Sequence, residues 1–329
     1  MLKRFAQLIA GRPADGPPSA AVAVFGKHPG WNDHMHELGL DSAALVDVRR
    51  ELYTEGVGRN VDGGAWEAMS EDERLDGFAH VFLRVRSEAV VCGRLWSSSD
   101  GRGRTRYPMV MAVQCRGTAP GEAVRRLAEP MRTGRDELRA APDAETVRTV
   151  HAGLGPAMTR RLAAAGGGAG ADSGEVERAA RAALATLAAR PELGPDAEGL
   201  LRVLWELERE LGPLPAGEAG APRRGVGGRG AEARGSLHRV PRGGDDPESA
   251  VARWYDLLAS WGIRERGALL LASDEADWVD VLLGPPTAAR LVCLRAGIGR
   301  IPLTSSVPFS LDDAWRAAMT ARIATAQQD

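Results

Sequence analysis

The sequence predicts an α/β fold, because strand-like and helix-like hydrophobic patterns occupy separate parts of its 329 residues. Short apolar runs of strand length lie between residues 20 and 115, and runs with helical periodicity lie between residues 122 and 211. Residues 248–329 carry both patterns again on a smaller scale. We therefore expect a sheet packed against helices, with an added helical block and a smaller C-terminal α/β part.

The strands of the first part are expected at residues 20–26, 78–86, 89–96 and 107–115. Ser87 and Glu88 form a short turn between the second and third runs, so these two should pair as a hairpin. Each of the other connections is long enough to carry polar and glycine-rich loop sequence, which is where binding groups usually lie.

The helices are expected at residues 41–53, 122–140, 143–165, 175–190 and 199–211. Within 143–165, Gly153, Gly155 and Pro156 should break or kink the helix, because proline removes a backbone donor and glycine weakens helices. The last four helices either cover the sheet or form a small helical subdomain.

The C-terminal part should contain a helix at 248–261, strands at 268–272, 278–283 and 290–294, and a last helix that Ser310 caps. These strands either extend the first sheet or build a small α/β domain against it.

Composition divides the chain into four ranges. We expect a flexible N-terminal arm at 1–19, an α/β domain with its helical block at 20–211, a disordered Gly/Pro/Arg linker at 212–247, and the C-terminal α/β part at 248–329. The linker is basic, so it could hold nucleic acid or an acidic partner. It lacks aromatic residues for base stacking, which favours a solvated segment.

Charge and cysteine content narrow the functional classes. The net charge of −2 gives no overall field toward nucleic acid or acidic lipid. Cys92, Cys115 and Cys293 are far apart and lie in apolar runs, as expected for buried thiols in a reducing compartment. No uninterrupted apolar run has the length of a membrane span, and Arg12 and Pro13 interrupt the N-terminal one. These features together predict a cytoplasmic protein without membrane insertion.

Two short motifs stand out, and we expect them to lie together in space. The first runs from Val24 to Asp33 and the second from Ser98 to Met109. Each joins an apolar strand to a turn rich in glycine, charge and proline, although both could serve only as tight connections.

These motifs resemble those of the TagF family, accessory regulators of bacterial type VI secretion. The pattern G-K-x-P-x-x-x-D falls on Gly26, Lys27, Pro29 and Asp33, and the pattern S-x-D-x-x-G-R-x-(F/Y)-P-L falls on Ser98, Asp100, Gly103, Arg104, Tyr107 and Pro108 with one extra residue before the tyrosine. His28, Asn32 and Met109 depart from the family pattern. The resemblance covers residues 20–118 and suggests a divergent relative.

The resemblance implies an α/β sandwich for the first part and a non-enzymatic protein that uses no cofactor. It also implies control of secretion-system assembly after translation, by binding a forkhead-associated scaffold protein.

The motif residues suggest a division of roles. Asp33 and Asp100 should hold the two loops, with Arg104 paired to one of them as an internal anchor. Lys27, Trp31, Arg102 and Arg106 should then form the partner-binding face. Trp31 could instead fold back onto its own domain.

Two alternatives remain open. His28, Asp33, His34 and His36 lie within nine residues and could ligate zinc in a metal-dependent hydrolase, although no second ligand pair follows. Arg94, Arg102, Arg104 and Arg106 surround one loop and could bind a phosphopeptide or nucleotide, as in an adaptor protein. Gly26-Lys27 does not fit a P-loop, and no G-x-S-x-G motif is present.

Overall fold

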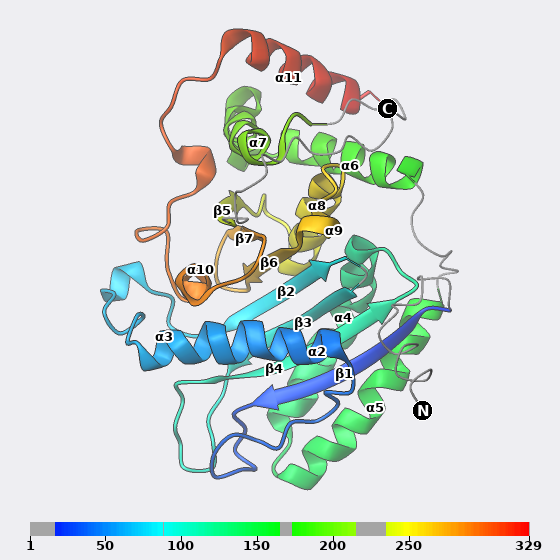
Figure 1. Ribbon diagram of the computed structural model, residues 1–329, viewed down its shortest axis with the longest axis vertical. Coiled ribbons are helices and arrows are strands. Elements are labelled where there is room, and N and C mark those ends of the chain that lie inside the picture. Colours follow the sequence, from blue (N-terminus) through cyan, green and yellow to red (C-terminus); the bar gives the residue numbers. More distant parts are fainter. Residues whose placement is uncertain (1–16, 88, 165–172, 215–234, 329) are drawn as a thin grey trace, which may run out of the picture.

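A seven-stranded antiparallel sheet with helices on both faces forms the centre of the molecule (Figure 1). The computed structural model describes residues 17–87, 89–164, 173–214 and 235–328. The strand order is β1-β4-β3-β2-β6-β7-β5. The strands are β1 (Ser19–Gly26), β2 (Ala79–Arg86), β3 (Ala89–Ser97), β4 (Pro108–Arg116), β5 (Ser236–Pro241), β6 (Ala268–Ser273) and β7 (Trp278–Leu283). The predicted α/β fold is therefore confirmed.

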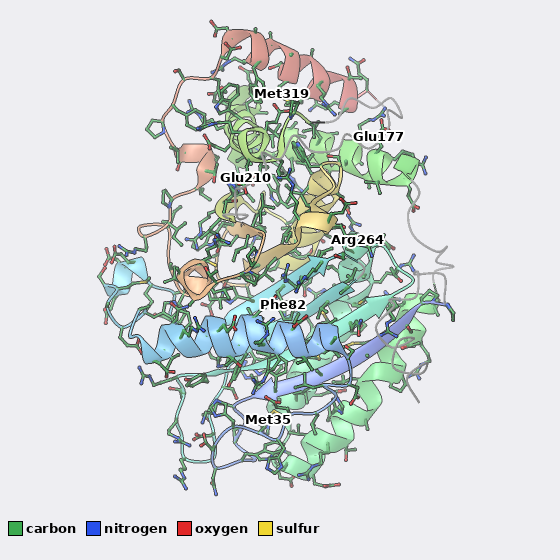
Figure 2. The ribbon with its side chains drawn as sticks, in the orientation of Figure 1. Met35, Phe82, Glu177, Glu210, Arg264 and Met319 are labelled. Carbon is green, nitrogen blue, oxygen red and sulfur yellow. The ribbon has the colours of Figure 1, made fainter. Side chains whose placement is uncertain are left out.

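Alternating side chains of the strands fill two cores, one on each face of the sheet; Figure 2 draws these side chains as sticks. In β1, Val22 and Val24 belong to one core and Ala23 and Phe25 to the other. This alternation arises because successive side chains of a strand point to opposite faces. Since both faces are buried, the strands read as nearly continuous apolar runs.

The first core packs the sheet against the long helices of the chain. These are α4 (Pro120–Ala140), α5 (Ala144–Ala163), α6 (Ser173–Ala188), α7 (Glu198–Leu211), α8 (Pro247–Ala259) and α11 (Asp313–Ala326). Figure 1 shows α4 and α5 behind the sheet, while α6, α7 and α11 stack at the end of the molecule beyond β5. The helical block therefore shares one core with the sheet and does not form a separate subdomain.

The second core lies under a single helical rod on the opposite face. The rod consists of α2 (Ala43–Val48), the π-helix η1 (Arg49–Gly58) and α3 (Arg59–Asp62), and it crosses in front of the strands in Figure 1. The buried pair of Arg84 Nε in β2 and Glu51 Oε2 in η1, 2.9 Å apart, fastens the rod to the sheet. The short helices are η2 (Glu71–Glu73), η3 (Pro191–Leu193), η4 (Pro195–Ala197), α9 (Ile263–Arg266), α10 (Ala288–Leu291), η5 (Val292–Leu294) and η6 (Thr304–Ser306).

The C-terminal strands extend the first sheet. β2 pairs with β6 from His80 opposite Ser273 to Val85 opposite Ala268. Of the two arrangements left open by the sequence, extension of the sheet is the observed one. The predicted strand at 290–294 is wrong: these residues form α10 and η5, whose buried residues cover the second core.

The basic range 212–247 contains structure that its composition did not predict. Residues 215–234 of the expected linker, like 1–16 of the expected arm, lie outside the described residues. Ser236–Pro241, however, forms edge strand β5. Arg239 in this strand is buried and donates to both carboxylate oxygens of Asp280, at 2.7 and 2.9 Å. Its guanidinium group also lies 4.3 Å from the Trp278 ring centroid. This arginine is therefore part of the interior and was wrongly expected to be solvated.

α5 stays continuous through Gly153, Gly155 and Pro156, so of the predicted break or kink the break does not occur. The helix packs along β1, where His151 Nε2 donates to Val22 O at 3.0 Å and Ala20 N donates to Thr159 Oγ1 at 3.0 Å. These bonds occupy the free side of an edge strand. Tertiary contact thus outweighs the weak local helix propensity.

Candidate functional site

The two motif loops lie at the same end of the sheet, as the sequence led us to expect. Gly26, the last residue of β1, pairs with Met109, and Ser97, the last residue of β3, pairs with Pro108. Because β4 begins where β1 and β3 end, the loops that follow those two strands meet. Lys27 N donates to Pro108 O at 3.1 Å, and Gly101 N donates to Trp31 O at 2.6 Å.

Gly26 is required at the point where the loops cross. Its φ of +117° lies in a region that side chains rarely adopt, and an added Cβ would lie 2.3 Å from Pro108 O. This glycine therefore allows the start of the first loop to approach β4 closely.

An ionic network with a buried centre, Lys27 and Asp100, joins the loops. Lys27 Nζ lies 2.9 Å from Asp100 Oδ2 and 2.5 Å from Asp33 Oδ1. Arg104 Nε lies 2.7 Å from Asp100 Oδ2, while its Nη2 lies 3.2 Å from Asp33 Oδ1 and donates to Asn32 O at 2.9 Å. We call Lys27, Asp33, Asp100 and Arg104 the clasp. It gives Arg104 the internal anchoring role suggested by the sequence.

Asp100 is the centre of the clasp. Its side chain is fully buried, and its Oδ1 accepts hydrogen bonds from Arg102 N at 3.0 Å and Arg104 N at 3.1 Å. Burial by itself raises the pKa of Asp100. The hydrogen bonds from Lys27 and from the backbone and side chain of Arg104 lower this pKa by more, so it lies well below its usual range. The group is thus a carboxylate at all ordinary pH values.

Asp33 occupies the exposed rim of the clasp. The hydrogen bond from Lys27, aided by the charge of Arg104, lowers the pKa of Asp33 to about 2. Its side chain is 68% exposed, so solvent screens these interactions more than those of Asp100.

The structure corrects the expected role of Lys27. Only 3% of this residue is exposed, and its ammonium group is held between two carboxylates. Lys27 therefore lies beneath the expected partner-binding face rather than on it. A buried ammonium group needs such compensation, which explains why both acidic residues converge on it.

The three other residues of that face have different surroundings. Arg102 is exposed, and its guanidinium group forms no hydrogen bond or ion pair with the described residues. Arg106 is exposed too, and its Nη2 donates to Glu67 Oε1 at 2.7 Å. Trp31 is half-buried: it packs against the first core, 5.6 Å from the His28 ring, with the Arg148 guanidinium 5.9 Å from its own ring centroid.

The remaining motif residues support the loops. Tyr107 Oη donates to Asp62 Oδ1 at 3.2 Å, which ties the second loop to α3. Gly103, with φ +77°, donates its N–H to Asp100 O at 2.8 Å and closes the turn. Ser98 and Pro29 line the pocket described below.

The histidine cluster does not converge on one point. His28 is buried, its Nδ1 accepts from Gly30 N at 3.0 Å, and its Nε2 donates to Leu138 O at 3.0 Å. His34 instead packs against the rings of Tyr53 and Tyr107, and His36 is exposed. Within residues 17–87, 89–164, 173–214 and 235–328, no three His, Cys, Asp or Glu side chains gather as metal ligands.

The arginine loop is also smaller than expected. Arg94 is buried on β3, where it pairs with Glu248 of α8 and lies 2.5 Å from Asp274 Oδ2. Arg104 belongs to the clasp. Of the four arginines considered from the sequence, Arg94 and Arg104 are thus engaged in these ion pairs. Only Arg102 and Arg106 present a guanidinium group outside them.

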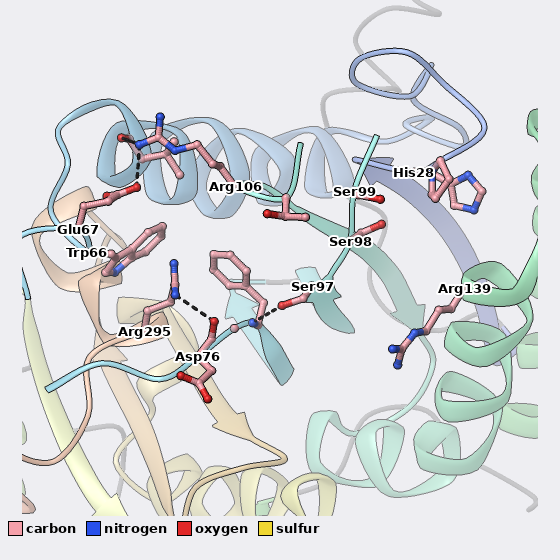
Figure 3. Close-up of a pocket in the computed structure, with 15 residues that line it drawn as sticks. His28, Trp66, Glu67, Asp76, Ser97, Ser98, Ser99, Arg106, Arg139 and Arg295 are labelled. Carbon is pink, nitrogen blue, oxygen red and sulfur yellow. Dashed lines mark hydrogen bonds and ion pairs between the residues drawn. The ribbon is translucent and has the colours of Figure 1, made fainter. Parts of the chain in front are cut away.

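A pocket of about 590 Å³ opens beside the motif loops (Figure 3). Its lining comes from six parts of the chain: His28 and Pro29; Val61, Trp66 and Glu67; Asp76, Gly77 and Phe78; Ser97, Ser98, Ser99, Thr105 and Arg106; Arg139; and Arg295. The sequence analysis did not identify Trp66, Glu67, Arg139 or Arg295. No local pattern distinguishes these residues, because they reach the pocket through the packing of α3, α4 and the segment after η5.

A second polar cluster resembles a catalytic triad but has the wrong connectivity. Glu210 Oε2 and Ser236 Oγ lie 2.8 and 3.0 Å from the same ring nitrogen, Nε2 of His238. In a triad the carboxylate and the hydroxyl contact opposite ring nitrogens. The histidine can then take a proton from the hydroxyl while the carboxylate holds the ring in place. This cluster instead ties α7 to β5.

No helix of the described part of the chain has the length and hydrophobicity needed to cross a membrane. Comparison with protein-family models, curated proteins and solved structures found no match for this chain.

Proposed function

We propose that the chain is a non-enzymatic, cytoplasmic regulator of type VI secretion that controls assembly after translation by binding another protein. The clasp is the observation that carries this proposal. Its charged groups neutralise one another between the loops. The motif residues that could act as acid, base or nucleophile therefore serve to hold the loop backbones together. A fixed pair of loops favours recognition, because little conformational entropy is lost on binding.

The contact face proposed here consists of Trp31, Arg102 and Arg106, and we call it the motif-loop surface. Arg102 is exposed and uncommitted, while Trp31, whose backbone oxygen accepts from Gly101 N, supplies a partly covered aromatic group in the adjoining loop. Arginine and tryptophan are the residues most enriched among strong interface contacts. By the resemblance to TagF, the partner is a forkhead-associated scaffold protein, which would present an acidic segment to these arginines.

A binding measurement with the purified chain and this scaffold protein from the same host tests the proposal. Arg102→Glu combined with Arg106→Glu should weaken binding by about tenfold or more, because both charges reverse. Arg160→Glu is the matched control: Arg160 is exposed on α5 and its side chain forms no ion pair or hydrogen bond with the described residues. Equal circular dichroism melts would show that the variants are folded.

The two parts of the proposal fail separately. Absence of binding by the unmutated chain would exclude the scaffold protein as partner, whereas undiminished binding by the double variant would exclude the motif-loop surface. In the host, overproduction should lower secreted effector proteins in the medium without lowering their cellular amounts, because the control acts after synthesis.

A further inference from the structure

The pocket beside the motif loops has donors that the fold leaves unused. Ser97 Oγ is occupied, since it accepts from Phe78 N at 2.8 Å. The hydroxyl groups of Ser98 and Ser99, by contrast, form no hydrogen bond with the described residues. Figure 3 shows both hydroxyl-bearing side chains on the side of the pocket where His28 and Arg139 lie.

Arg139 supplies an uncommitted guanidinium group on that side. It forms no ion pair or hydrogen bond with any described residue, and acts on Asp136 only by lowering its pKa through charge. Its position is nevertheless defined, because His28 Nε2 holds the carbonyl of the preceding residue, Leu138, at 3.0 Å. The first motif loop thus fixes the end of α4 from which Arg139 projects.

The charge of the lining is positive. Arg106, Arg139 and Arg295 face Glu67 and Asp76, which gives three positive and two negative groups, or a net charge of +1. His28 adds no charge in this geometry, because its Nδ1 accepts a hydrogen bond from Gly30 N and so carries no proton, and burial also lowers its pKa. Arg106 neutralises Glu67 at 2.7 Å, and Figure 3 shows the Asp76 carboxylate far from Ser98, Ser99 and Arg139.

Arg295 closes the opposite side of the pocket in a fixed orientation. Its Nε donates to Leu75 O at 3.3 Å, and its Nη2 donates to Leu75 O at 3.2 Å and to Asp76 O at 3.0 Å. The guanidinium carbon lies 5.9 Å from the Trp66 ring centroid and 5.6 Å from that of Phe78. Because these contacts engage Nε and Nη2, the remaining nitrogen, Nη1, is free to donate to a ligand.

We propose that this pocket binds a ligand that carries a phosphate monoester, and that Arg139, Ser98 and Ser99 hold the phosphate group. A phosphate monoester presents three charged acceptor oxygens, which match one guanidinium fork and two hydroxyl donors. A carboxylate has only two oxygens and would be satisfied by the arginine alone. The volume of about 590 Å³ lies in the range of small-molecule sites and leaves room for the organic part of the ligand.

Titration calorimetry with the full chain provides the test, using inorganic phosphate, phosphoserine, adenosine monophosphate and succinate. Inorganic phosphate and at least one ester should bind, and succinate should bind at least about tenfold more weakly. Affinity for the phosphate esters should increase from pH 5.5 to pH 7.5, since the second pKa of a phosphate monoester is about 6. Preference for phosphoserine or for the nucleotide identifies the source of the ligand.

Variants separate this pocket from general surface charge. Arg139→Gln, and separately Ser98→Ala with Ser99→Ala, should each weaken phosphate binding by about tenfold or more. Arg160→Gln should leave it unchanged. The side chains replaced form no bond that stabilises the fold, so these variants should remain folded.

The proposal is overturned if neither phosphate nor an ester binds, if succinate binds as tightly, or if Arg160→Gln reduces binding as much as Arg139→Gln. No scaffold protein takes part in the measurement. Failure here is therefore distinct from failure of the proposed regulatory role.

Discussion

At the scale of single residues, burial decides what each charged motif side chain does. Asp100 and Asp33 occupy equivalent positions around Lys27, yet one carboxylate is fully buried and the other is 68% exposed. Removal of a buried carboxylate leaves its hydrogen-bond donors unsatisfied, whereas water can replace an exposed carboxylate. Replacing Asp100 should therefore reduce the stability of the fold more than replacing Asp33.

Asp100→Ala should lower the melting temperature by about 2–6 °C, because it strands Lys27 and two backbone N–H groups. Asp33→Ala, the matched control at the exposed end of the clasp, should have a smaller effect. Calorimetry of both variants makes the comparison. If Asp100→Ala melts like the parent but no longer binds the partner, Asp100 is a contact residue instead.

The buried histidine His80 should make stability depend on pH. Burial, with the charges of Arg239 and Arg94, lowers its pKa to about 3 from the usual 6.5. Below pH 6.5 the unfolded chain takes up a proton that the folded chain refuses, so this contribution is complete above pH 6.5 and is lost as pH falls toward 3.

Between pH 6.5 and pH 5, this loss amounts to about 2 kcal/mol in the free energy of unfolding. Urea denaturation of the parent and of His80→Gln at pH 7 and pH 5 measures it. The variant should lose less stability than the parent over this interval. Identical losses would show that His80 does not titrate in this way.

At the scale of elements, α5 shows how packing preserves a helix with unfavourable residues. Gly153 lies in its exposed surface, where an added Cβ would meet no atom within 4 Å. Gly26 is the opposite case, because its added Cβ would lie 2.3 Å from Pro108 O. The consequences of replacing these glycines should therefore differ in sign.

Gly153→Ala should raise the free energy of unfolding by about 0.5–1 kcal/mol, since alanine reduces the entropy that the unfolded helix segment loses. Gly26→Ala should lower it. Chemical denaturation of both variants gives the two values. A destabilising Gly153→Ala would mean that α5 is kinked or locally open there in solution.

At the scale of the whole molecule, the sheet joins the two ends of the chain. β2 lies between β3 and β6, which are separated by more than 170 residues in sequence. The first core likewise contains residues from β1 through α11. One shared core and one sheet predict cooperative folding rather than two independent parts.

A fragment of residues 1–211 should therefore not fold stably alone, because it lacks β5, β6, β7 and α8. It should gain native circular dichroism when it is co-expressed with residues 235–329. Hydrogen exchange of the β2 amides reports the pairing with β6 directly. A monomeric 1–211 fragment with protected β2 amides would show that the first part is an independent domain.

The sequence by itself determined most elements and the meeting of the two motifs. Short apolar runs identified β1, β2, β3 and β4, and helical periodicity identified α4 to α8, because these signals come from residues near one another in the chain. Glycine, proline and paired charges likewise marked the two loops and the internal role of Arg104. The α/β class follows from these local patterns.

Only the tertiary structure decided the arrangements that depend on distant residues. The polar, basic range 212–247 contains β5, because Asp280 and the Trp278 ring compensate the buried charge of Arg239. The apolar run at 290–294 is helical, and its side chains cover the second core. Lys27 proved to be interior, and Arg139 and Arg295 reached one pocket from segments far apart in the chain. Burial and convergence are properties of packing between remote segments, so no local sequence pattern can specify them.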